Sequence, residues 1–112
     1  MVDLSFLEKF TKGDSKKMKR YISLYLDMAP GTFDTMEKNL VNNDWEQLRI
    51  NAHSFKPQAE FMGAISLKEK LDVIEYSIKN NHLSEIEEIV RSARLINDHY
   101  INLLEEYLSN SK

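Results

Sequence analysis

The residues of this chain best suited to chemistry lie in one short stretch centred on His53. On a helix that turns by about 100° per residue, the apolar residues of this stretch share one face, roughly 180° to 260° away from His53. They are Leu48, Ala52, Phe55, Ala59 and Met62. His53 therefore belongs to the opposite, polar face, where water and a partner molecule can reach its imidazole.

Four other residues lie within about 60° of His53 on this predicted face: Arg49, Lys56, Pro57 and Glu60. Lys56 follows the histidine by one turn, so its ammonium group and the imidazole can reach the same ligand. Pro57 is unusual inside a helix, because it cannot donate a hydrogen bond to the His53 carbonyl, at a cost of about 3 kcal/mol. An exposed neutral imidazole beside a cation is a competent nucleophile toward an activated phosphoryl group.

The motif A-H-S-F-K-P at residues 52–57, followed by Gly63, resembles the signature of histidine-containing phosphotransfer (HPt) domains of bacterial phosphorelays. The resemblance covers most of the chain. It departs from the usual motif at Phe55, where Leu is common, and at Pro57, where Gly is common. It implies that His53 carries a phosphoryl group and that Lys56 neutralises the charge on its oxygens.

The resemblance also implies a phosphorelay intermediate, which accepts the phosphoryl group from an aspartyl phosphate on one receiver domain and passes it to another. Because the sequence has no glycine-rich nucleotide motif, the chain is expected to have no kinase activity of its own. We expect Mg²⁺ to come from the receiver and no cofactor or metal to bind to this chain. The expected partner-binding residues are Arg49, Pro57, Glu60, Gly63, Ala64 and Lys79.

Glu75 is the residue predicted to orient the imidazole. Aligned without gaps through Gly63, it occupies the position where phosphotransfer domains often place a glutamine that bonds the histidine. We expect Glu75 to accept a hydrogen bond from Nδ1–H of His53, which leaves Nε2 as the nucleophile.

The composition is that of a single globular domain spanning residues 1–112, with 42% hydrophobic and 29% charged residues. The chain has no cysteine, which agrees with a reducing cytoplasm, and no apolar run long enough to span a membrane. Its net charge of −3 gives no general attraction to nucleic acid. We therefore expect a cytoplasmic monomer that binds neither nucleic acid nor membrane, and the resemblance implies that its partners are receiver domains.

Hydrophobic periodicity predicts only helices, separated by proline, glycine and asparagine and started by capping residues. Asp14 and Asp44 are predicted N-caps, and capping boxes are predicted to begin at Ser66 and Ser84. Pro30 is expected to end the second helix. The predicted helices cover residues 3–10, 14–29, 31–41, 44–62, 66–80 and 84–108.

Short connections between amphipathic helices favour an all-α, antiparallel up-down four-helix bundle. We expect this bundle to comprise residues 30–112, with two additional N-terminal helices in residues 1–29 covering it. The cluster of Lys and Arg in residues 16–20 is predicted to be a solvated helix face, with an acidic partner as the alternative.

Two other functions are compatible with parts of this pattern. An adaptor bundle could bind a receiver domain or a partner helix without carrying phosphate. A metal-binding bundle would use His53, His82 and His99, but no two of these histidines lie within one helical turn of each other.

Overall fold

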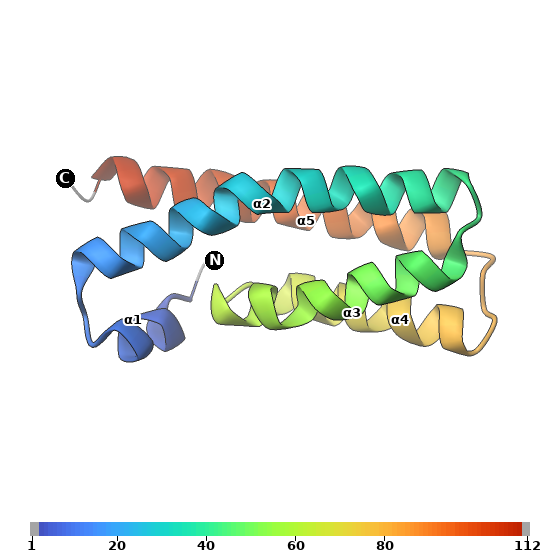
Figure 1. Ribbon diagram of the computed structural model, residues 1–112, viewed down its shortest axis with the longest axis horizontal. Coiled ribbons are helices and arrows are strands. Elements are labelled where there is room, and N and C mark those ends of the chain that lie inside the picture. The colour runs from blue at the N-terminus through green and yellow to red at the C-terminus, as the bar shows by residue number, and fades with distance from the viewer. Residues whose placement is uncertain (1–2, 111–112) are drawn as a thin grey trace.

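The computed structural model describes residues 3–110, and these residues form five helices and no strand. The four long helices run alternately up and down, and they close into a bundle in which α2 also packs against α5 (Figure 1). The prediction of an all-α fold is thus confirmed. The helices are α1 (Ser5–Thr11), α2 (Ser15–Val41), α3 (Trp45–Phe61), α4 (Ile65–Lys79) and α5 (Ile86–Asn110).

The predicted helix break at Pro30 is wrong, because α2 continues through this residue. The boundary drawn between residues 29 and 30 therefore falls inside one helix, and one of the two expected covering helices is the first half of α2. The reason is tertiary packing, since burial of one continuous stripe outweighs the local cost of about 3 kcal/mol for an internal proline. That stripe consists of Met18, Ile22, Tyr25, Ala29, Phe33 and Met36. In Figure 1 the first half of α2 is inclined to the second, as expected near a proline.

Two of the predicted helix caps are present. The side chain of Asp14 accepts a hydrogen bond from the Lys17 amide, and that of Asp44 accepts one from the Gln47 amide. The capping box predicted at Ser66 is wrong, because α4 already begins at Ile65 and Ala64 is its N-cap, without a side-chain hydrogen bond. Helix α5 begins at Ile86, two residues after Ser84.

The connection between α3 and α4 is tight, and it depends on Gly63. Gly63 has a left-handed backbone with φ of 72°, which is typical of a glycine that follows the end of a helix. A Cβ at this position would lie 1.6 Å from the backbone oxygen of Asp3. Glycine therefore also allows the segment before α1 to cross the α3–α4 turn.

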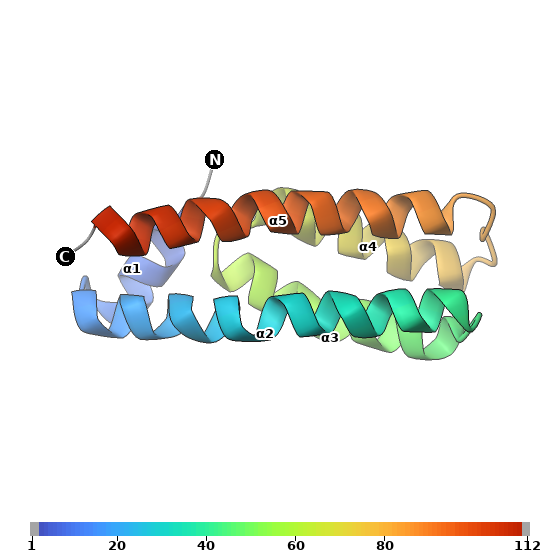
Figure 2. The ribbon, with the colours of Figure 1, turned by 90° about the horizontal axis from the view of Figure 1, so that it is seen from above.

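Helices α2 and α5, of 27 and 25 residues, are longer than α3 and α4, of 17 and 15 residues. At about 1.5 Å per residue, the difference is more than 10 Å. Helix α1 packs against α2, and in Figure 2 it lies behind the projecting ends of α2 and α5. Its Phe10 ring makes edge contacts with Tyr21 of α2 and Phe61 of α3, and its Phe6 ring contacts Phe61.

The core contains the whole predicted stripe of the motif helix, and all five of its side chains are at most 4% exposed. Within residues 3–110, no helix combines the length and apolarity needed to cross a membrane.

Candidate functional site

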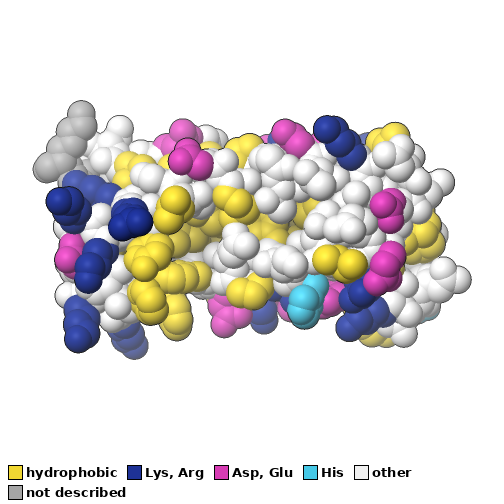
Figure 3. All heavy atoms as spheres, in the orientation of Figure 1, with side chains coloured by type: hydrophobic (Ala, Val, Ile, Leu, Met, Phe, Trp, Pro, Cys, Tyr) yellow, Lys and Arg dark blue, Asp and Glu magenta, His cyan; other side chains and the backbone are white. Residues whose placement is uncertain are grey.

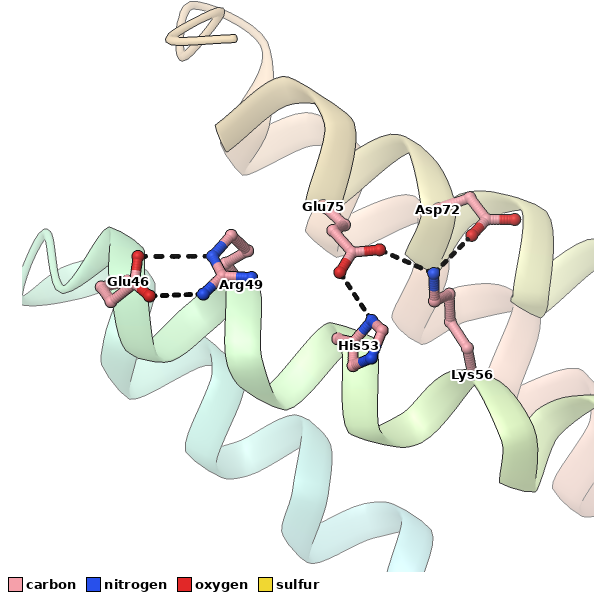
Figure 4. A network of polar contacts seen from close by, with 6 residues as sticks. All are labelled: Glu46, Arg49, His53, Lys56, Asp72 and Glu75. Carbon is pink, nitrogen blue, oxygen red and sulfur yellow. Dashed lines mark hydrogen bonds and ion pairs between the residues drawn. The ribbon is translucent and has the colours of Figure 1, made fainter. Parts of the chain in front are cut away.

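The site lies on the helical hairpin formed by α3 and α4. His53 precedes Ala64, the N-cap of α4, by eleven residues, and Glu75 follows it by eleven. Lys56 and Asp72 each lie eight residues from Ala64. Because the two helices are antiparallel and joined by a tight turn, residues equally far from the turn face each other. The hairpin thus places His53 opposite Glu75, and Lys56 opposite Asp72 (Figure 4).

His53 is exposed and Glu75 is buried, and their side chains are in direct contact. Nδ1 of His53 lies 2.7 Å from Oε2 of Glu75, with side-chain exposures of 65% and 9% respectively. Within residues 3–110, the buried Oε2 atom has no hydrogen bond of regular geometry, so the approach of Nδ1 is the polar contact that it makes. Two acceptors at this distance would repel each other, so Nδ1 must carry a proton. The predicted contact between Glu75 and Nδ1 is therefore confirmed, whereas the hydrogen bond from Nδ1–H stays a prediction. A neutral ring with its proton on Nδ1 would have its lone pair on Nε2.

Lys56 is more constrained than its position on the motif suggests. Its Nζ lies 2.6 Å from Oε1 of Glu75 and 2.9 Å from Oδ1 of Asp72. Lys68 approaches the other oxygen of Asp72, at 3.6 Å. The ammonium group of Lys56 is thus shared by two carboxylates of α4, and it holds the oxygen of Glu75 that His53 does not contact.

The charges of this network stabilise one another. Burial alone would raise the pKa of Glu75, but the hydrogen bond and charge of Lys56, together with the His53 ring, lower it below its ordinary value. The hydrogen bond from Lys56 likewise lowers the pKa of Asp72. The hydrogen bonds to Glu75 and then to Asp72 raise the pKa of Lys56. Glu75 is therefore a carboxylate at neutral pH, as an acceptor for Nδ1–H requires.

Two predicted partner-binding residues on α3 lie on the same surface as His53. Arg49, one turn before the histidine, forms an ion pair with Glu46 (Figure 4). Glu60 is exposed two turns after it. Lys79 is exposed in the last turn of α4.

The expectation that Gly63 and Ala64 contact a partner directly is not supported. Ala64 is 1% exposed and belongs to the core. The Asp3 backbone crosses Gly63, which is buried as well. Both residues shape the turn that sets the register between α3 and α4, and this requirement explains their place beside the motif.

Pro57 lies inside α3, which continues to Phe61. Together with His53 it borders an open groove of about 560 Å³. This groove, which we call the His53 groove, is bordered by Phe6, Phe10, His53, Lys56, Pro57, Glu60, Phe61 and Lys68. The two phenylalanines of α1 are 59% and 58% exposed, which is unusual for large apolar side chains. Their position beside His53 was not predicted, because the sequence does not indicate how α1 folds back onto α3.

Phe61 separates the His53 groove from a second, apolar groove of about 320 Å³ between α2 and α3. Figure 3 shows apolar side chains gathered on this face, next to a cluster of Lys and Arg at the end where α2 begins. Residues 9–20 contain six of the fifteen Lys and Arg residues of the chain and only one acidic residue. One end of an otherwise acidic molecule is therefore strongly basic.

Fold and site together define a helical bundle with an exposed histidine that contacts a buried glutamate and borders a groove lined partly by apolar side chains. The model of the family described as the Hpt domain matches residues 20–111. The chain therefore belongs to the Hpt domain family, whose members carry phosphoryl groups on histidine in two-component phosphorelays and are not kinases.

Among solved structures, the fold is similar to that of histidine-containing phosphotransfer protein B (HptB) from Pseudomonas aeruginosa PAO1. The TM-score is 0.87 and the sequence identity 18%, over 95% of this chain and 92% of that chain. No curated protein matches the sequence.

Proposed function

We propose that this chain is a phosphorelay intermediate that accepts a phosphoryl group on His53 from the aspartyl phosphate of one receiver domain and passes it to another. The observation that carries the proposal is the contact between His53 and Glu75. It fixes the proton on Nδ1 and leaves Nε2, on a ring that is 65% exposed, as the free nucleophile.

In the transfer step, the Nε2 lone pair attacks phosphorus in line with the bond to the receiver aspartate. The N–P bond forms as the P–O bond breaks, and the bonding electrons leave on the aspartate oxygen. The ring gains a positive charge while Nδ1 keeps its proton, and the carboxylate of Glu75 stabilises this charge. Transfer to the next receiver is the same step in reverse.

Lys56 supports this chemistry in two ways. Its contact with Oε1 holds Glu75 in place. Lys56 can also turn from Asp72 toward the arriving phosphoryl group and offset the repulsion between this group and the carboxylates of Asp72 and Glu75 while the receiver docks. Lys56→Ala is expected to slow transfer by about tenfold or more.

The His53 groove is the surface on which we expect the receiver to dock, with Pro57, Phe6 and Phe10 as apolar contacts. Arg49, Glu60 and Lys79 would contact its rim. We expect the receiver to bring Mg²⁺ in its own acidic pocket. The negative charge of that pocket would also be attracted by the basic residues 9–20 while the receiver approaches. We expect the chain to act in the cytoplasm as a monomer.

The proposal is tested by incubating the chain with a phosphorylated receiver. Acid-labile phosphate should appear on the wild-type chain and be absent from His53→Gln, whose helical circular dichroism spectrum should be unchanged. Label on His82 or His99, both exposed, would contradict the assignment. Tight receiver binding without any transfer would instead identify an adaptor bundle.

A further inference from the structure

Asp72 is a charged residue of the site for which the proposed transfer step provides no role. It nevertheless contacts Lys56, which lies 2.9 Å from Asp72 and 2.6 Å from Glu75 (Figure 4). Two of the three ammonium hydrogens are therefore directed at α4 and not at the exposed side of the imidazole. A phosphoryl group on Nε2 must compete with these carboxylates for Lys56.

The two competing contacts differ in how easily they can be given up. Glu75 is 9% exposed, and its other oxygen is held by His53. Asp72 is 44% exposed, and its other oxygen lies near Lys68. Water and Lys68 can therefore replace Lys56 at Asp72, whereas a buried Glu75 without Lys56 would leave an unpaired charge. Asp72 is the contact that yields when Lys56 turns toward the phosphoryl group.

We propose that Asp72 is a positioning residue that competes with the phosphoryl group on His53 for the Lys56 ammonium and thereby shortens the lifetime of the phosphohistidine. The inference rests on the proposed function, because it concerns the phosphorylated form of the same histidine. The consequence of this competition is a short-lived phosphohistidine that remains a good phosphoryl donor to the next receiver.

The direction of the effect follows from the chemistry of phosphohistidine hydrolysis. Water attacks phosphorus, the N–P bond breaks, and its electrons return to Nε2 as inorganic phosphate is released. In a loose, metaphosphate-like transition state the phosphoryl oxygens carry less negative charge than in the ground state. A cation on these oxygens therefore stabilises the phosphohistidine more than the transition state and slows hydrolysis.

The test is the half-life of phosphorylated His53 in the isolated chain. Phosphoramidate, a small-molecule donor that releases ammonia, can load the histidine without any receiver, and ³¹P NMR follows the loss of the phosphoryl group. Asp72→Asn should lengthen the half-life by about three- to tenfold, because it frees Lys56 from one charged partner. Asp72→Glu restores the carboxylate and should return the half-life toward that of the wild type.

Glu69→Gln is the matched control, since Glu69 is exposed on the same helix and its loss changes the net charge equally. It should leave the half-life unchanged. An unchanged half-life in Asp72→Asn would overturn the proposal. So would an equal lengthening when Asp72→Asn is combined with Lys56→Met, because the effect would then not pass through Lys56. If phosphoramidate loads His53 but phosphorylated receivers do not, the receiver relay fails while the role of Asp72 is still measured.

Discussion

Replacing Lys56 by methionine should destabilise the fold, because it leaves the carboxylate of Glu75 buried without its main cation. Removing one partner of a fully buried ion pair costs about 3 to 5 kcal/mol, and an exposed pair contributes about 1 kcal/mol at most. The side chains of Lys56 and Glu75 are 19% and 9% exposed, which places this pair nearer the buried limit. We therefore expect Lys56→Met to lower the free energy of unfolding by about 2 to 3 kcal/mol.

The assay is urea unfolding at pH 7, followed by circular dichroism. For a domain of this size the expected loss corresponds to roughly 10 °C in the melting temperature. The double variant Lys56→Met/Glu75→Gln removes the charge together with its partner, so it should recover most of the lost stability. A single variant within about 0.5 kcal/mol of the wild type would refute the view that Lys56 compensates a buried charge.

The pair of Lys56 and Glu75 also predicts how the stability of the fold changes with pH. Lys56 and His53 lower the folded-state pKa of Glu75 below its ordinary value of 4.5. The resulting stabilisation is therefore fully present above pH 4.5 and is lost as the pH falls through the lower, folded-state pKa. At a pH low enough to protonate Glu75, the Lys56→Met variant no longer has an uncompensated buried charge at this position. The stability difference between the variant and the wild type should shrink below this pH.

Three further predictions concern the elements around the site. Gly63→Ala should destabilise the fold by about 1 kcal/mol or more, because the new Cβ would clash with Asp3 and the φ of this residue is positive. Gly31→Ala, in open space inside α2, should instead stabilise the fold by about 0.5 to 1 kcal/mol. Thermal melts of both variants test this contrast. Pro57→Gly should preserve phosphotransfer but change receiver affinity, and equal affinities by calorimetry would remove Pro57 from the docking surface. Charge reversal at Lys16 and Lys17 should lower the second-order transfer rate by about threefold or more at low salt and weaken its salt dependence, and a salt-independent wild-type rate would exclude steering by this end.

The exposure of His53 could be predicted from local periodicity, and its contact with Glu75 from the family resemblance. The 3.6-residue period places His53 opposite the core stripe of α3. The resemblance to phosphotransfer domains, aligned without gaps through Gly63, places Glu75 where relatives have a glutamine that bonds the histidine, and the structure has this contact at 2.7 Å. The same alignment places Asp72 opposite Lys56, but an acidic residue on an exposed helix face does not by itself indicate a role in a site.

The features that were missed depend on tertiary packing. Pro30 was expected to end a helix, yet Ala29 and Phe33 are both fully buried, and their burial keeps α2 continuous. Asn97 interrupts the apolar stripe of α5 and is 1% exposed. It is buried because its Oδ1 accepts a hydrogen bond from the hydroxyl of Tyr25, which is far away in the sequence. Local patterns do not identify such a partner.

The most direct test of the proposed site is ¹⁵N NMR of the His53 ring before and after phosphorylation by a phospho-receiver. Before transfer, the neutral ring should carry its proton on Nδ1. After transfer, Nε2 should be coupled to phosphorus, with Nδ1 still protonated. A proton on Nε2 of the neutral ring, or a phosphoryl group on Nδ1, would contradict the assignment of Glu75 as the residue that orients the nucleophile.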